Sequence, residues 1–160
     1  MASFEVWRAV DPDRPYVQED HDPLAGEGAS FASGRWHTRA PAKRLVYVAE
    51  HPALAYLEAL AADPTIRRLW IYRIRVETPA IEEVPPEIGE ALRRRDVGAT
   101  QAYGDAWYED GGRPPVLRVP SVILPLAFNY VLRVLDERLV AQVLAREELE
   151  VDERFWGASK

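Results

Sequence analysis

The chain has 160 residues, no cysteine and a formal net charge of -6. A chain of this length usually forms one domain, and without cysteine it can form no disulfide, Zn–Cys site or reactive thiol. The acidic balance argues against a long footprint on nucleic-acid phosphates, because that kind of binding needs clustered Lys and Arg.

Strand-forming and helix-forming segments alternate in the first half of the chain. Residues 4–10 are rich in aromatic and β-branched types and predict a strand, whereas residues 11–33 contain three prolines and two glycines and predict a long irregular loop. Residues 44–50 predict a second strand. A helix is predicted over residues 52–62, with Pro52 in its first turn, and a long strand over residues 67–77.

The second half continues in the same way. A helix is predicted over residues 86–95 and a short second helix within residues 99–112, stopped by Gly111 and Gly112. Residues 114–125 and 128–135 predict two or three short strands. Residues 136–151 are ambiguous, because helical spacing and a strand near residues 148–151 both fit. This interleaving of strands and helices predicts a single α+β domain spanning residues 1–160.

A basic, glycine-bearing stretch runs from Gly26 to Glu50, with four cations and no acid between Gly28 and Ala49. Such a local patch suits a small anionic ligand in an acidic protein. Its glycines match neither the dinucleotide fingerprint nor the Walker phosphate loop. Arg35 is the strongest candidate ligand, because a guanidinium pairs with phosphate oxygens; an ordinary surface arginine is the alternative. We expect Arg39, Lys43 and Arg44 to add general attraction for an anion, and Trp7, Trp36 and Trp107 to be packing residues.

Glu58 is the only charged residue between Pro52 and Ala62. It shares a helical side with Leu54 and Ala61, which places its carboxylate beside an apolar face. Glu58 is therefore either a residue at the solvent edge or a functional acid.

The remaining candidates are single residues. Ser121 interrupts an apolar run, and its hydroxyl either bonds nearby backbone or serves a site; without a G-x-S-x-G elbow, Ser–His–Asp hydrolysis is disfavoured. Tyr47 is either an aromatic at the core edge or a stacking platform. His21, His37 and His51 stand singly and show no metal-binding spacing, so we expect no metal site.

Taken in order, Arg35 in "SGRW", Tyr47 in "VYVAE", Glu58 in "ALAYLEAL" and Ser121 in "LRVPSVILP" resemble the RES domain family, the toxins of bacterial RES–Xre toxin–antitoxin pairs. The likeness continues through "VWRAV", "YGDAWYEDGGRPPVLRVPSVILP", "NYVL" and "DERF", nearly the whole chain. The family implies a fold similar to ADP-ribosyltransferase toxins, with small mixed or antiparallel sheets flanked by helices around an NAD-binding cleft.

The resemblance also implies an activity: a toxin of a type II toxin–antitoxin system that degrades NAD+ by cleaving its nicotinamide–ribose bond. The acceptor would be water, phosphate or a protein side chain, giving an NAD+ glycohydrolase, a phosphorylase or an ADP-ribosyltransferase. Glu58 would stabilise an oxocarbenium-like ribose, with Arg35 and Tyr47 as further catalytic residues. Arg35 would hold a phosphate or ribose end, and Tyr47 would stack on or orient the nicotinamide. The substrate-binding set implied by the family is Arg35, Tyr47, Ser121, Arg8 and Asn129, and Ser121 would hydrogen-bond the ligand or hold Glu58 in place.

The implied partners are NAD+ as substrate and an Xre-like antitoxin, with a homodimer or a larger toxin–antitoxin assembly as further options. We expect no cofactor, no direct nucleic-acid contact and no membrane contact; with no apolar run near 20 residues and no signal peptide, we expect a place in the bacterial cytoplasm. The chain departs from the family at Ser33, at Ala40 and in "RVLDER", which replaces an Asn-Pro-x-His run. The alternative function is a non-catalytic nucleotide- or partner-binding module with the same fold.

Overall fold

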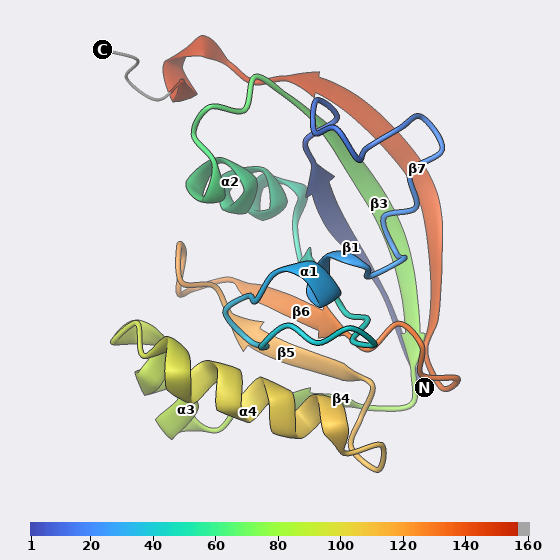
Figure 1. The fold of residues 1–160 in the computed structure, drawn as a ribbon, viewed down its shortest axis with the longest axis vertical. Helices are drawn as coiled ribbons and strands as arrows, with labels where there is room; N and C mark the ends of the chain where they lie inside the picture. Colours follow the sequence, from blue (N-terminus) through green and yellow to red (C-terminus); the bar gives the residue numbers. More distant parts are fainter. Residues whose placement is uncertain (157–160) are drawn as a thin grey trace.

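One seven-stranded sheet organises the chain in the computed structural model, which describes residues 1–156 (Figure 1). Its strands are β1 (Ala2–Val10), β2 (Val46–Ala49), β3 (Arg68–Thr78), β4 (Ile81–Glu83), β5 (Val116–Pro120), β6 (Phe128–Leu132) and β7 (Val140–Glu150), arranged in the order β4-β5-β6-β2-β1-β3-β7. The helices are α1 (Gly28–Phe31), α2 (Pro52–Ala62), α3 (Pro86–Arg93) and α4 (Val97–Glu109), followed by the 3-10 helix Glu153–Phe155. The predicted α+β class is confirmed, with the strands in one continuous sheet where separate small sheets were expected.

The sheet bends sharply between β1 and β2. These two strands pair only at Trp7 and Ala49, whereas β1 pairs with β3 over its whole length. Because the link is so narrow, the half β1-β3-β7 folds toward the half β4-β5-β6-β2. Val6 and Ile74 from one half meet Val46 in the same buried cluster. The outer faces of both halves are thereby left for the helices.

Helix α2 covers the outer face of β1 and β3. Its start is set by the sequence: Pro52 occupies the first turn and the His51 side chain accepts a hydrogen bond from the Ala53 amide at 3.0 Å. Leu60 then packs with Leu69 and Ile71 of β3. On the other half, α3 and α4 lie along the outer side of β5 and β6 (Figure 1). The two helical layers therefore flank the bend in the sheet.

Several boundaries differ from the sequence prediction. The predicted loop 11–33 contains the four-residue helix α1, which is too short to show a period, and α4 starts at Val97 because Asp96 caps it. The three-residue strand β4 was not predicted. The helical interpretation of residues 136–151 is wrong, because β7 pairs with β3 along almost its full length.

The segment "RVLDER", which departs from the family pattern, has a structural role. Buried Arg133 donates hydrogen bonds from Nη1 to the carbonyls of Trp107, Tyr108 and Asp110 at 2.9–3.1 Å. These carbonyls lie at the C-terminal end of α4, where helical partners run out. Arg133 therefore caps α4. Within residues 1–156, no helix is long and apolar enough to cross a membrane.

Candidate functional site

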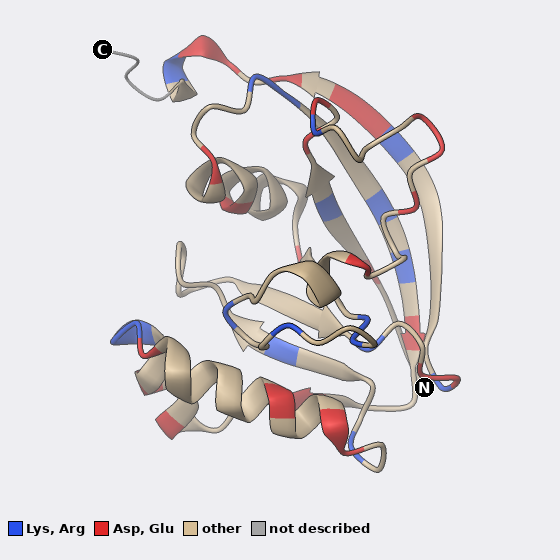
Figure 2. Ribbon diagram, viewed as in Figure 1, with Lys and Arg blue, Asp and Glu red and all other residues tan. Residues whose placement is uncertain are grey.

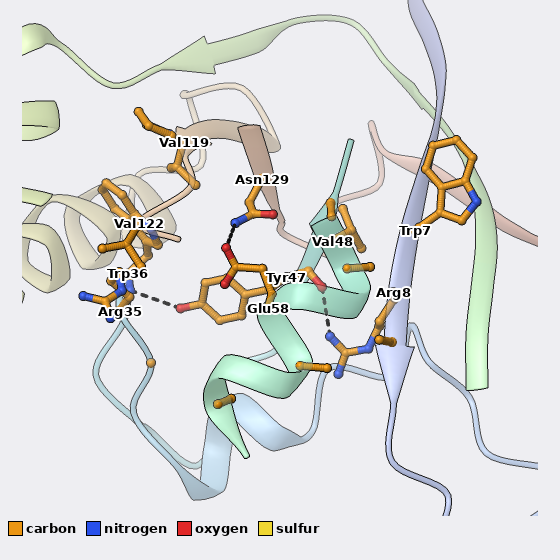
Figure 3. Close-up of a pocket in the computed structure, with 17 residues that line it drawn as sticks. Trp7, Arg8, Arg35, Trp36, Tyr47, Val48, Glu58, Val119, Val122 and Asn129 are labelled. Carbon is orange, nitrogen blue, oxygen red and sulfur yellow. Dashed lines mark hydrogen bonds between the residues drawn. The ribbon is translucent and has the colours of Figure 1, made fainter. Parts of the chain in front are cut away.

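A cavity of about 410 Å³ opens where the two halves of the sheet diverge, between α2 and the connection from α1 to β2 (Figure 3). This volume lies in the range of roughly 300–1,000 Å³ that is usual for small-molecule sites. Five of the six residues predicted for the site line it: Arg8, Arg35, Tyr47, Glu58 and Asn129. The sixth, Ser121, is buried behind Glu58.

Helix α2 presents Glu58 to the cavity on a face that is otherwise alanine. Ala55, Ala59 and Ala62 share this face through spacings of three, four and seven residues, and all three line the cavity. The prediction that the Glu58 carboxylate lies beside an apolar side of the helix is confirmed, although the residues of α2 that line the cavity with it are these alanines and not Leu54 and Ala61. The small alanine side chains leave the carboxylate as the longest group that α2 places there.

Two donors from the opposite half of the sheet hold the Glu58 carboxylate. Ser121 Oγ donates to Glu58 Oε1 at 2.6 Å. Asn129 Nδ2 donates to the same oxygen at 3.0 Å (Figure 3). Ser121 Oγ in turn accepts from the amides of Ile123 and Leu124 at 3.1 and 3.0 Å. The interpretation of Ser121 as a hydroxyl that bonds nearby backbone is therefore confirmed, and the same hydroxyl also contacts Glu58. Every hydrogen bond that residues 1–156 give this carboxylate goes to Oε1, which leaves Oε2 for a ligand.

The Tyr47 hydroxyl is fully engaged within the protein. It lies 2.6 Å from His37 Nδ1 and accepts from the Trp36 amide at 3.2 Å, while His37 Nε2 lies 2.9 Å from the carbonyl of Ala32. Only Nε2–H can serve that carbonyl, so Nδ1 accepts and the tyrosine donates. Burial lowers the pKa of His37 and raises the pKa of Tyr47, which favours the neutral forms of both. What Tyr47 offers a ligand is therefore its ring.

The hydrogen-bonded pair of His37 and Tyr47 leaves no room for a side chain at Gly34. A Cβ at Gly34 would lie 2.7 Å from the Tyr47 hydroxyl oxygen and 2.9 Å from Cε1 of His37. The glycine therefore allows close packing behind Arg35 and does not form a phosphate loop. His37 was not among the predicted site residues: in the sequence it is a lone histidine, and only its partner ten residues further on reveals its role.

Two arginines lie on opposite sides of Glu58 and Tyr47 (Figure 3). Arg35 is half-buried, and its guanidinium has no hydrogen bond or ion pair with any residue of the described chain. Arg8 donates from Nη1 to the carbonyl of Tyr47 at 3.0 Å, while its buried Nε has no partner within residues 1–156. Burial also lowers the pKa of Arg8. Both guanidiniums thus keep donors for an anionic ligand.

The other cations of the connection between α1 and β2 contribute unequally. Basic positions recur along this connection (Figure 2), but Lys43 is buried and forms an ion pair with Asp105 at 2.8 Å. The prediction that Lys43 adds to a general attraction is therefore wrong, since its charge is neutralised. Arg39 is exposed and remains compatible with that role.

The fold and the cavity define an α+β domain with a cavity of small-molecule size, in which a fixed carboxylate and an aromatic ring lie between two arginines. The sequence profile of the RES domain family matches residues 5–152. The chain belongs to the RES domain family, as its motifs predicted. No curated protein matches the sequence.

Proposed function

We propose that this RES domain is the NAD+-consuming toxin of a type II toxin–antitoxin pair and that it cleaves the nicotinamide–ribose bond of NAD+. One observation carries the proposal: Glu58, fixed by Ser121 and Asn129, lies between Arg8 and Arg35 in a single cavity. Membership of the RES domain family supports it.

The carboxylate suits the chemistry of this bond. When the N-glycosidic bond breaks, its electron pair leaves with nicotinamide and the ribose C1 develops oxocarbenium character. A carboxylate held beside C1 stabilises that positive charge, and it does so best when it needs no reorientation. The two donors on Oε1 supply this fixed orientation.

The surrounding groups suit the remainder of the dinucleotide. A guanidinium binds pyrophosphate oxygens in pairs, and Arg35 has all its side-chain donors available for this. Arg8 offers a second cation from the opposite side of Glu58 (Figure 3). The nicotinamide ring of NAD+ is cationic, so the face of the Tyr47 ring is a favourable neighbour for it.

The acceptor would form a bond to the ribose C1 as the bond from C1 to nicotinamide breaks. Water would yield ADP-ribose, inorganic phosphate would yield ADP-ribose-1″-phosphate, and a protein side chain would become ADP-ribosylated. In each case Glu58 would accept a proton from the incoming nucleophile or orient the ribose hydroxyls. We further propose an Xre-like antitoxin that covers this cavity, in the bacterial cytoplasm.

The test is a product assay. Purified protein free of antitoxin is incubated with NAD+, with and without phosphate, and nicotinamide, ADP-ribose and ADP-ribose-1″-phosphate are resolved by chromatography. Loss of one fixed electrostatic group typically costs about 10²- to 10³-fold in kcat, and we expect a loss of that order in Glu58→Gln. Arg35→Ala should chiefly raise KM.

Two matched variants serve as controls. Glu109→Gln removes an exposed carboxylate, and Arg75→Ala removes an exposed arginine of β3 that does not line the cavity; both should retain activity. Folded wild-type protein that binds NAD+ without releasing nicotinamide would favour the non-catalytic module instead. Full activity in Glu58→Gln would refute the mechanism.

A further inference from the structure

We propose that helix α4 positions Arg35: Thr100, Gln101 and Gly104 hold the backbone of residues 34–36 and thereby fix the place from which the Arg35 guanidinium reaches the cavity. The functional consequence rests on the proposed function, because NAD+ is the ligand that Arg35 would bind. The placement itself rests on three contacts between α4 and three consecutive residues.

Two of the contacts are hydrogen bonds from side chains of α4 to backbone carbonyls. Thr100 Oγ1 donates to the carbonyl of Arg35 at 2.7 Å, and Gln101 Nε2 donates to the carbonyl of Gly34 at 2.8 Å. Thr100 is only 1% exposed, so water cannot replace its hydroxyl. A buried carbonyl that loses its donor is costly, which ties the backbone of Arg35 to this helix.

The third contact is a direct approach of two backbones. A Cβ at Gly104 would lie 1.7 Å from the carbonyl oxygen of Trp36 and 2.7 Å from its carbonyl carbon. Glycine is unfavourable inside a helix compared with alanine, so its presence in α4 needs a packing reason. Positions 100, 101 and 104 are neighbours on one side of the helix. The carbonyls of residues 34, 35 and 36 each meet one of them.

The same segment is held from its other sides as well. The Trp36 amide donates to the Tyr47 hydroxyl of β2, and Asp105 of α4 accepts from the Thr38 amide at 2.9 Å. The backbone around Arg35 is therefore clamped between α4 and β2. A long arginine side chain loses less conformational entropy on binding a ligand when its backbone is already fixed. The clamp between α4 and β2 therefore favours ligand affinity.

The experiment compares substitutions on this side of α4. Thr100→Val keeps the shape and removes the hydroxyl, Thr100→Ser restores the hydroxyl, Gln101→Leu removes the amide donor, and Gly104→Ala introduces the Cβ. The control is Gly98→Ala in the first turn of α4, where a Cβ would meet nothing closer than Asp96 Oδ1 at 3.6 Å. Each variant is measured for kcat and KM with NAD+, for NAD+ binding by calorimetry in a Glu58→Gln background, and for amide hydrogen exchange in residues 33–38.

We expect Thr100→Val and Gln101→Leu each to raise KM and Kd for NAD+ by about 3- to 10-fold, the range for one typical hydrogen bond. Their kcat should change less, and exchange in residues 33–38 should accelerate. Thr100→Ser should recover most of the affinity for NAD+. Gly104→Ala should lower the affinity for NAD+ more than Gly98→Ala does. In an Arg35→Ala background, Thr100→Val should cause no further loss, because the contact acts through Arg35.

Failure of the inference can be told apart from failure of the proposed function. If wild-type protein neither binds nor cleaves NAD+, the proposed function fails. Amide hydrogen exchange in residues 33–38 of the α4 variants then still tests whether α4 holds this backbone segment. The inference is overturned if Thr100→Val and Gln101→Leu leave that exchange unchanged. It is equally overturned if their effect on NAD+ affinity persists in full without the Arg35 side chain.

Discussion

Ser121→Ala is the most informative single substitution outside the cavity wall. Ser121 is buried and does not line the cavity beside Glu58, yet its hydroxyl donates to Glu58 Oε1 and accepts from two backbone amides. Alanine removes only this oxygen. Any effect on NAD+ cleavage must therefore pass through the orientation of Glu58 or through the backbone after β5.

The magnitude follows from the hydrogen bonds that are lost. A hydrogen bond to a carboxylate contributes about 1.5–3 kcal/mol. If loss of this hydrogen bond removes about 2 kcal/mol of transition-state stabilisation, kcat should fall about 30-fold, because 1.36 kcal/mol corresponds to a factor of ten in rate. The amides of Ile123 and Leu124 lose an acceptor as well, so the free energy of unfolding should fall by about 1–3 kcal/mol.

The assay pairs nicotinamide release with urea unfolding at a temperature where the variant stays folded. Ser121→Cys serves as a control of similar shape with a weaker donor and should lie between wild type and Ser121→Ala. In a Glu58→Gln background the further loss of kcat should be small, because both changes affect one unit. Wild-type kcat in a destabilised Ser121→Ala protein would refute the role of this hydroxyl in orienting Glu58.

Three further outcomes are expected around the cavity. Gly34→Ala should lower the free energy of unfolding by about 1–3 kcal/mol and weaken NAD+ binding, as its Cβ would press on Tyr47 and His37; an unchanged urea midpoint would contradict this. Arg8→Ala should raise KM for NAD+ more than Arg8→Lys does, since lysine keeps the charge. Equal KM values in the two variants would argue against binding of NAD+ by a cation at the Arg8 side of the cavity. The lowered pKa of His37 means that its stabilisation is full above about pH 6.5 and is lost as pH falls toward the folded value. Urea unfolding at pH 7.5 and 5.5 should therefore show a decline that is shallower in His37→Gln, and parallel declines would contradict the assignment.

Local sequence signals predicted the regular elements where those signals are strong. The prediction of helix α2 over Pro52–Ala62 is confirmed without a shift, because proline marks its start and alanine and leucine continue it. The short elements α1 and β4 carry too few residues for any periodicity. Strand β7 stayed ambiguous because it is an edge strand with mixed exposure, which hides the alternation expected of a strand.

The residues of the candidate site were predicted from their motifs, and the family resemblance offered a contact between Ser121 and Glu58, but the other contacts were not predicted. Ser121 and Asn129 lie 63 and 71 positions from Glu58 along the chain, and no local pattern connects them. The link between His37 and Tyr47 and the contacts of α4 with residues 34–36 were equally invisible. The neutralised charge of Lys43 shows the same limit, since its partner Asp105 lies on a distant helix.

The sequence by itself determined the chemistry that is available: an acidic domain without cysteine, a local basic stretch, and the ordered Arg35, Tyr47, Glu58 and Ser121 of the RES domain family. Residue types and local propensities are properties of short segments, so they can be recognised without a fold. Only the tertiary structure decided which groups meet. The bend at the single β1–β2 pair opens the cavity, and the register of β2 with β6 places Asn129 opposite Ala49, near the start of the helix that carries Glu58.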